Sequence, residues 1–289
     1  MQGTVDGFGY GLMTPVVAFL MACLGAALGL RCTTRSLRAE RSRRAGWLAL
    51  GALSIGSGIW TMHFVAMLGF TVQEAPVTYD RPLTFAGLAV AIVMVGIGIF
   101  LVGYQGATPM ALVTGGTITG LGVASMHYLG MAGMRFDGHF AYDTLTVSLS
   151  VVIAVVASTA ALWAAVSIHG FLPSLGAGVV MGVAVSGMHY TGMAALRVHL
   201  HPGAATATAG DTPTSLLLPM MIGPGCFLLL AGVIVMIDPL VVTGTPGGRV
   251  RTPGPGFPAG RRVAAIPVQR RRTPYASAAR RGGGQLRNR

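Results

Sequence analysis

Long apolar stretches separated by short polar segments recur along most of the chain. Seven of them are long enough to cross a bilayer as helices, which takes about 20 residues. We place these spans near residues 10–30, 46–70, 83–103, 111–132, 145–168, 174–196 and 215–237. The first span should stay uncleaved, because it lacks the basic start of a signal peptide and only Asp6 precedes it as a charge. The pattern predicts an all-α, polytopic membrane protein with seven transmembrane helices.

The charges indicate an orientation for these spans. Only 10% of the residues are charged and 53% are hydrophobic, against about 25% charged in a soluble domain. Six arginines follow the first span and eleven lie from Arg249 onward, whereas the other side holds only Arg81, Arg135 and Arg197. Cytoplasmic loops collect arginine. We therefore expect a multi-pass plasma-membrane protein whose N-terminus is outside and whose C-terminus is cytoplasmic.

Residues 243–289 differ from the membrane domain, which we place at residues 1–242. This last segment is rich in Gly, Pro and Arg and has too few apolar residues for a core, so it is predicted to be a disordered tail. Its arginines are expected to contact anionic lipid headgroups. An acidic protein or a nucleic acid is the weaker alternative, because membrane topology already accounts for the positive charge.

A six-residue motif recurs in the second, fourth and sixth spans. Its three copies are Met62-His63-Phe64-Val65-Ala66-Met67, Met126-His127-Tyr128-Leu129-Gly130-Met131 and Met188-His189-Tyr190-Thr191-Gly192-Met193. A glycine stands seven residues before each histidine, and a Tyr-Asp pair follows the first two copies in the outer loop, as Tyr79-Asp80 and Tyr142-Asp143. The chain is therefore predicted to contain three two-helix repeats and one extra helix. The glycines are expected to allow close helix packing.

The histidines are candidate ligands for a metal ion. Counting along the predicted helices places all three in the outer half of the membrane, roughly 10–12 Å below the helix ends. Ionisable residues inside spans usually face an interior, and imidazole together with thioether, without thiolate or carboxylate, favours copper. The candidate ligands are His63, His127, His189, Met62, Met67, Met126, Met131, Met188 and Met193.

Other interpretations of the same residues are open. The methionines can be apolar filling, and two of the histidines could hold a haem for electron transfer, which would leave the third idle. Copper transport or a membrane copper chaperone is a further alternative, although few polar groups lie inward of the histidines. His139, His199 and His201 are expected in outer loops and His169 on the cytoplasmic side, where solvated histidines are common. The three cysteines form no CxxC pair and indicate neither a disulfide framework nor a zinc site.

The intact Met-His-Tyr-Thr sequence at Met188–Thr191 and its two variants resemble the MHYT-domain family of bacterial integral membrane sensors. The resemblance covers about residues 10–237. It implies a copper site near the outer face, formed by the histidines and methionines named above, that senses oxygen, carbon monoxide or nitric oxide. Many members of this family carry cyclase, phosphodiesterase, kinase or DNA-binding modules. The sequence shows no phosphate-binding loop, nucleophile elbow or paired carboxylates, so we expect a non-enzymatic sensor that signals to a separate protein.

Overall fold

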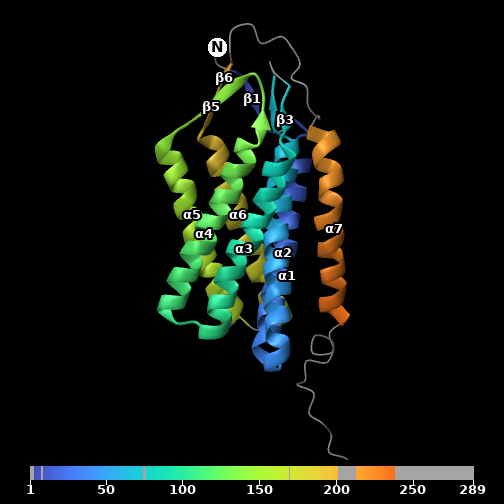
Figure 1. The fold of residues 1–289 in the computed structure, drawn as a ribbon, viewed down its shortest axis with the longest axis vertical. Helices are drawn as coiled ribbons and strands as arrows, with labels where there is room; N and C mark the ends of the chain where they lie inside the picture. Colours follow the sequence, from blue (N-terminus) through green and yellow to red (C-terminus); the bar gives the residue numbers. More distant parts are fainter. Residues whose placement is uncertain (1–2, 8, 74–75, 169, 201–212, 238–289) are drawn as a thin grey trace, which may run out of the picture. The chain divides into compact units, whose positions relative to one another are not determined.

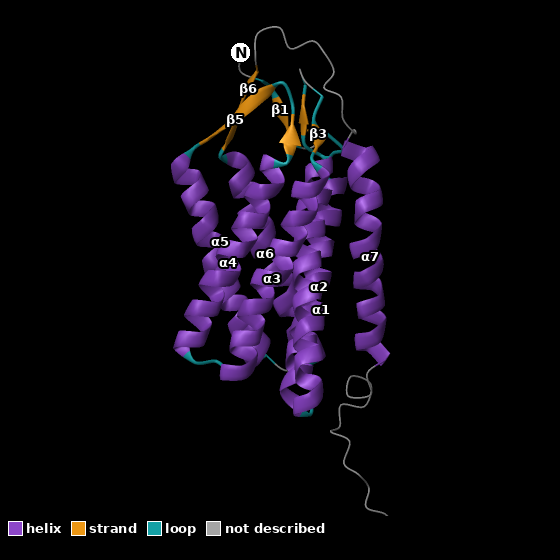
Figure 2. Cartoon of the chain, in the orientation of Figure 1, coloured by secondary structure: helices purple, strands orange, loops and turns teal. Residues whose placement is uncertain are grey.

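The computed structural model of the chain describes residues 3–7, 9–73, 76–168, 170–200 and 213–237, which all belong to one compact unit, residues 1–246. Its helices are α1 (Met13–Arg38), α2 (Arg41–Leu68), α3 (Arg81–Gln105), α4 (Pro109–Ala132), α5 (Thr144–Ser167), α6 (Phe171–Ala194) and α7 (Pro213–Ile237). Its strands are β1 (Val5–Asp6), β2 (Thr71–Val72), β3 (Thr78–Tyr79), β4 (Met134–Arg135), β5 (Gly138–Tyr142) and β6 (Leu196–Leu200). The helices run side by side and the strands gather at one end of them (Figures 1 and 2).

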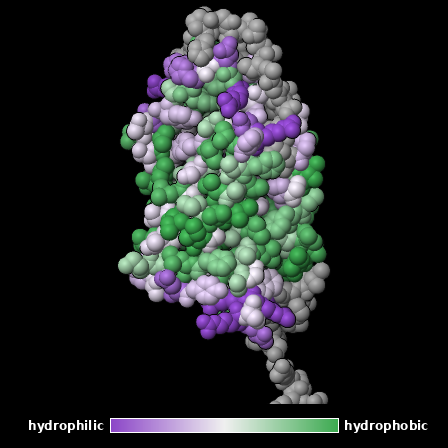
Figure 3. All heavy atoms as spheres, viewed as in Figure 1, coloured by the Kyte–Doolittle hydropathy of each residue, from purple (hydrophilic) through white to green (hydrophobic). Residues whose placement is uncertain are grey.

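Each of the seven predicted spans coincides with one helix, and each helix is long and apolar enough to cross a membrane. On the face seen in Figure 3, apolar side chains form a band between hydrophilic ends. The first two boundaries were wrong, because α1 continues to Arg38 and α2 begins at Arg41. Arginine is a good helix former whose stem can lie along apolar surface, so both helices extend past their apolar stretches. The predicted loop shrinks to residues 39–40. The tail at 243–289 lies outside the described residues.

Each repeat is closed by a ribbon of two strands that the sequence analysis did not predict. The antiparallel pairs are β1 with β2, β3 with β4, and β5 with β6. In every pair, the first strand precedes an odd-numbered helix and the second follows the next even-numbered helix. The repeat unit is therefore strand–helix–helix–strand rather than two helices alone. Strands of two to five residues are too short to show a period-two pattern in the sequence.

The six repeat helices form a closed ring, in which α6 contacts α1 as the other neighbours contact each other. The glycine seven residues before each histidine lies where an even helix crosses the odd helix of the next repeat. A Cβ at Gly56 would lie 2.8 Å from Ile92 Cα, and one at Gly120 would lie 2.5 Å from Val155 Cα. A Cβ at Gly182 would collide with Cys23 of α1. The close-packing role predicted for these glycines is confirmed.

The seventh helix lies outside this ring, against α1 and α2. Part of this helix packs in a small apolar cluster, in which Leu228, Ala231 and Val235 contact Leu28 and Cys32. Leu217 and Met221 of the same helix belong to the main hydrophobic core. The extra helix predicted from the sequence is therefore an addition to the three repeats that packs against their outside and also adds to the core.

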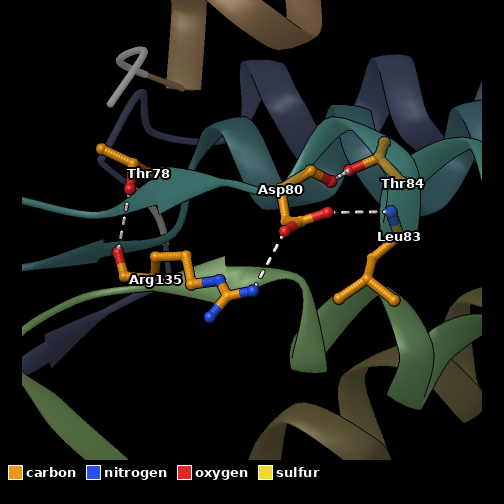
Figure 4. A network of polar contacts seen from close by, with 5 residues as sticks. All are labelled: Thr78, Asp80, Leu83, Thr84 and Arg135. Carbon is orange, nitrogen blue, oxygen red and sulfur yellow. Dashed lines mark hydrogen bonds and ion pairs between the residues drawn. The ribbon is translucent and has the colours of Figure 1, made fainter. Parts of the chain in front are cut away.

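The Tyr-Asp pairs lie where a strand ends and a helix begins, rather than in an open loop. Asp80 caps α3 by accepting a hydrogen bond from the Leu83 N–H (3.0 Å), and its other oxygen pairs with Arg135 of β4 (3.0 Å), as Figure 4 shows. The Leu83 N–H and then Arg135 lower the pKa of the Asp80 carboxyl. Asp143 caps α5 in the same way through the Thr146 N–H (2.9 Å).

Candidate metal centre

The three histidines are brought to one level by equivalent anchors at the helix ends next to the strand ribbons. Each lies five residues before the last residue of its helix, which is about 7.5 Å of helix rise, shallower than the 10–12 Å predicted. The residue six positions after each histidine accepts a backbone hydrogen bond from the chain entering the paired odd helix. These bonds run from Gly9 to Gly69, from Asp80 to Gly133 and from Asp143 to Ala195.

His63, His127 and His189 form a triangle whose corners are their Nδ1 atoms. The edges measure 3.1 Å between His63 and His189, 3.2 Å between His63 and His127, and 3.3 Å between His127 and His189. The rings are nearly perpendicular to one another. The interplanar angle is 78° between His63 and His189, 83° between His63 and His127, and 87° between His127 and His189. Each histidine is 1% exposed. The structure therefore brings the three histidines proposed as ligands together at one buried point.

Protons alone do not satisfy this triangle. A neutral imidazole has one N–H and one lone pair, so each Nδ1 is either a donor or an acceptor toward both neighbours. Whatever the assignment, at least one pair of Nδ1 atoms faces lone pair to lone pair or hydrogen to hydrogen. Unmatched buried polar atoms are costly. A cation at the centre of the triangle removes the mismatch, because it accepts all three lone pairs at once.

The triangle also has the right size for a single metal ion. The centre of an equilateral triangle with these edges lies about 1.85 Å from each corner, close to the 2.0–2.1 Å of a metal–imidazole bond. Among the described residues, these three side chains form the cluster of His, Cys, Asp or Glu that could hold an ion, with ligand atoms within 4.8 Å of one another. The residues present therefore fit a three-coordinate metal.

The opposite sides of the His63 and His127 rings lie against glycines that the sequence analysis did not identify as part of the site. The Nε2 atom of His63 lies against Gly130 of α4, and that of His127 lies against Gly192 of α6, where an added Cβ would come within 2.5 Å. Both glycines stand three residues after a histidine, and Ala66 occupies this position in α2. The recurrence of a small residue in all three motifs was the signal that could have identified them.

The aromatic residue after each histidine covers its own imidazole edge-on. The ring centroids are 4.7 Å apart for Phe64, 4.8 Å for Tyr128 and 5.0 Å for Tyr190. The hydroxyl of Tyr128 is hydrogen-bonded to that of Ser150 in α5 at 2.6 Å. Phe64 instead packs against Trp60 at 4.8 Å. These rings shield the triangle from the surrounding helices.

The methionines are buried near the triangle, but their role as ligands stays a prediction. Met62, Met67, Met126, Met131 and Met188 are at most 1% exposed, and Met193 is partly buried. The side chain of Met126 packs beside Gly87 of α3, where an added Cβ would have Met126 Cγ at 3.7 Å. Met188 lines a cavity between the helices.

The other two described histidines do not join this cluster. His139 and His199, predicted in loops, are instead opposite residues of the ribbon β5–β6, with ring centroids 5.2 Å apart in a stacked arrangement. The loop prediction was wrong because both segments are short strands. His169 and His201 lie outside the described residues.

Comparison with known proteins confirms the repeat. A family model named MHYT, described as a bacterial signalling protein N-terminal repeat, matches residues 56–115, 120–178 and 182–234. Each match begins at or beside one of the crossing glycines Gly56, Gly120 and Gly182. No solved structure matches the chain.

Several curated proteins are similar to this region. MucR of Pseudomonas aeruginosa, a bifunctional diguanylate cyclase and cyclic di-GMP phosphodiesterase, is 40% identical over 64% of this chain and 28% of its own. NbdA of the same organism, a cyclic di-GMP phosphodiesterase, is 34% identical over 70% of this chain and 27% of its own. The signalling protein YkoW of Bacillus subtilis is 30% identical over 63% and 24%. The chain thus spans about a quarter of the length of these relatives.

Proposed function

Because this chain belongs to the MHYT family of bacterial signalling proteins, we propose that it is a membrane sensor that holds one copper ion between His63, His127 and His189. The observation that carries the proposal is the buried triangle of Nδ1 atoms, whose edges of 3.1–3.3 Å suit one ion and no arrangement of protons. The signal that it detects is a diatomic gas or a change of redox state at that ion.

Copper fits the ligand chemistry of this site better than zinc or iron. Three neutral imidazoles in an apolar interior supply no negative charge, and a monovalent ion tolerates such a site better than a divalent one. Zinc commonly recruits a fourth ligand or water. Met126 and Met188 immediately precede His127 and His189 in the sequence. Their thioethers are soft donors, which favour Cu(I). When bound, copper supplies a redox-active centre that can coordinate a small gas.

The chain's own residues hold, orient and shield this centre. The caps and ribbons fix the outer helix ends at one level, the glycines after the histidines set the direction of the rings, and the aromatic side chains cover them. Histidines drawn from three repeats couple the ion to the packing of the whole ring. We propose that a change at the ion alters this packing and that a separate signalling protein reads the alteration, without catalysis by the membrane domain itself.

The alternatives fit the geometry less well. Axial ligands on opposite faces of a haem are about 4 Å apart, twice an iron–nitrogen bond, whereas these Nδ1 atoms are 3.1–3.3 Å apart. Copper transport needs a continuous path of donors, but the residues one helical turn from the histidines are Ile59, Val123 and Val185. The cavity next to them offers the thioethers of Met181 and Met188 in a wall that is otherwise mostly aliphatic. A static sensing site is therefore the better interpretation.

Metal analysis of the purified protein tests the proposal. We expect one copper per chain in the wild type and in His139→Ala, which removes an exposed histidine from β5. We expect most of the copper to be lost in His63→Ala, His127→Ala and His189→Ala, because two imidazoles are a weaker ligand set. Retention of a full copper equivalent by all three variants would falsify the assignment. Helical content measured on each sample shows whether the variants still fold.

A further inference from the structure

A cavity of about 40 Å³ lies inside the helix ring, on the inward side of the histidine triangle. Its wall follows the repeat. The residues four positions before the histidines, Ile59, Val123 and Val185, line it, and so do those eight positions before, Ile55, Thr119 and Met181. On a helix these positions lie one and two turns below each histidine, on the same face. The cavity wall therefore begins about one helical turn from the triangle, on the helices that carry the histidines.

The chemistry of the wall selects apolar ligands. All lining residues except Thr119 and Ser158 are aliphatic or methionine. The Thr119 hydroxyl is already bonded to the Met94 carbonyl at 3.4 Å. Space for one water needs roughly 10–15 Å³ by the same measure, and apolar cavities of this kind stay dry and accept apolar atoms. A volume of about 40 Å³ accommodates a ligand of two heavy atoms.

The cavity exists because the third repeat departs from the other two at one packing position. In the second repeat, Met94 of α3 fills the space against Gly122 of α4. In the first, Gly25 and Gly58 bring the backbones into direct contact, with an added Cβ only 2.7 Å from the facing Cα. In the third, the equivalent residues are Ala157 and Ala184, and both line the cavity.

We propose that this cavity is the binding site for a diatomic gas, held about one helical turn from the histidine triangle. The proposal rests on the proposed function for its purpose, because the cavity would hold the gas in reserve near the ion. Its physical basis is separate, since an apolar cavity binds an apolar gas with or without a metal. Ala157 and Ala184 are positioning residues, because they leave the space that the gas occupies.

Methionine methyl groups report on the cavity directly. In metal-free protein labelled with ¹³C-methyl methionine, dissolved dioxygen should broaden the Met181 and Met188 signals, because both line the cavity and dioxygen is paramagnetic. Met126, which is fully buried and does not line it, should change little. Exposed Met110 should respond to gas in the surrounding hydrocarbon and serves as the reference for that background. Carbon monoxide at saturation should reverse the effect at Met181 and Met188 only.

The double variant Ala157→Met with Ala184→Gly copies the filled packing of the second repeat. It should reduce the oxygen effect at Met181 and Met188 to the level of Met126. The matched control is Ala160→Met, which adds the same side chain on the exposed side of α5 and should leave the effect intact. If Met181 and Met188 in the wild type respond no more than Met126, or if the double variant responds as the wild type does, the cavity is not the gas site.

The metal measurements separate the two proposals. Normal copper content in a wild type that shows no oxygen effect would overturn the gas site and leave the metal centre. An oxygen effect in a protein that takes up no copper would support the gas site and overturn the metal centre. In Cu(I)-loaded protein, the double variant should keep its copper and bind carbon monoxide more weakly than Ala160→Met. Equal carbon monoxide affinity in these two variants would also overturn the gas site.

Discussion

The orientation of the His63 and His127 imidazoles is set by glycines, which have no side chain. Gly130 and Gly192 admit the Nε2 edges of His63 and His127, so that the Nδ1 atoms turn toward the common centre. Neither of these two Nε2 atoms makes a hydrogen bond. The orientation of the two imidazole rings is therefore set by the packing of their neighbours. A polar cluster held in this way depends on packing as much as a hydrophobic core does.

Gly192→Ala should accordingly disrupt the site. The new Cβ would lie 2.5 Å from His127 Nε2, so the ring must tilt and the triangle must widen. We expect reduced copper content and a loss of about 1–3 kcal/mol in stability, typical of overpacking. Gly187→Ala on the same helix meets no atom within 4 Å and should leave both quantities near their wild-type values. Equal copper content in the two variants would contradict this role of Gly192.

The sequence predicted which residues meet but not how they face each other. Three histidines in equivalent motifs on three helices indicate convergence, because repeats related by a common axis bring equivalent residues together. The choice of Nδ1 over Nε2 depends on what lies behind each ring, which is a residue of another repeat. The methionine assignment has the same weakness, since an offset of one or four residues along a helix does not determine where a flexible side chain ends.

Helix packing in this protein depends on glycines at defined crossings. Gly56 of α2 meets the backbone of α3 at Ile92, at the same register as Gly120 and Gly182 in the other repeats. Small residues allow membrane helices to approach closely, where dispersion and weak polar contacts stabilise them. The hydropathy of the helices explains why they enter the membrane, and these crossings explain how they assemble.

Gly56→Ala should weaken the contact between the first and second repeats. Its Cβ would lie 2.8 Å from Ile92 Cα, so α2 and α3 must separate. We expect a lower thermal unfolding midpoint, corresponding to about 1–3 kcal/mol. The control is Gly46→Ala, also in α2, which meets nothing within 4 Å and should be neutral or slightly stabilising because alanine favours helix. Similar midpoints for both variants would show that the crossing tolerates more space than the structure indicates.

The cap at the start of α3 predicts a pH dependence. The pKa of Asp80 lies below its ordinary value because the Leu83 N–H and Arg135 favour the charged form. The resulting stabilisation is present above the unfolded pKa of about 3.9 and is lost as the pH falls through the lower folded value. Asp80→Asn should therefore make the unfolding midpoint less sensitive to acid. Glu40→Gln, at a helix start without a side-chain cap bond, should keep the wild-type sensitivity.

At the scale of the whole molecule, the described arginines of the α1–α2 connection and the strand ribbons lie at opposite ends of the helices. The expected orientation, with the ribbons outside, makes a prediction about access. In a cysteine-free background, His139→Cys in β5 should react with a membrane-impermeant maleimide on intact cells. Ala107→Cys, between α3 and α4, should react only after the cells are permeabilised. The reverse labelling pattern would invert the topology.

The seven spans and the three repeats could be predicted from the sequence, because hydropathy and a repeated motif are local properties of the chain. The ribbons β1–β2 and β3–β4 were not, since strands of two residues have no pattern of their own. The cavity was not accessible either. It results from a difference between Met94 of the second repeat and Ala157 at the equivalent position of the third. In the sequence alone, both are ordinary apolar residues of a membrane helix.

The closure of the ring by α6 and α1 makes the three hairpins interdependent. Each hairpin contributes one corner of the triangle, and two of the corners are seen to rest on the following hairpin, at Gly130 and Gly192. A single hairpin, or two of them, thus has neither enough donors nor enough supports to assemble the centre. We therefore expect that displacing any one hairpin would weaken the contacts of the other two at the triangle, so that a change in one bond there would alter the packing of all six helices.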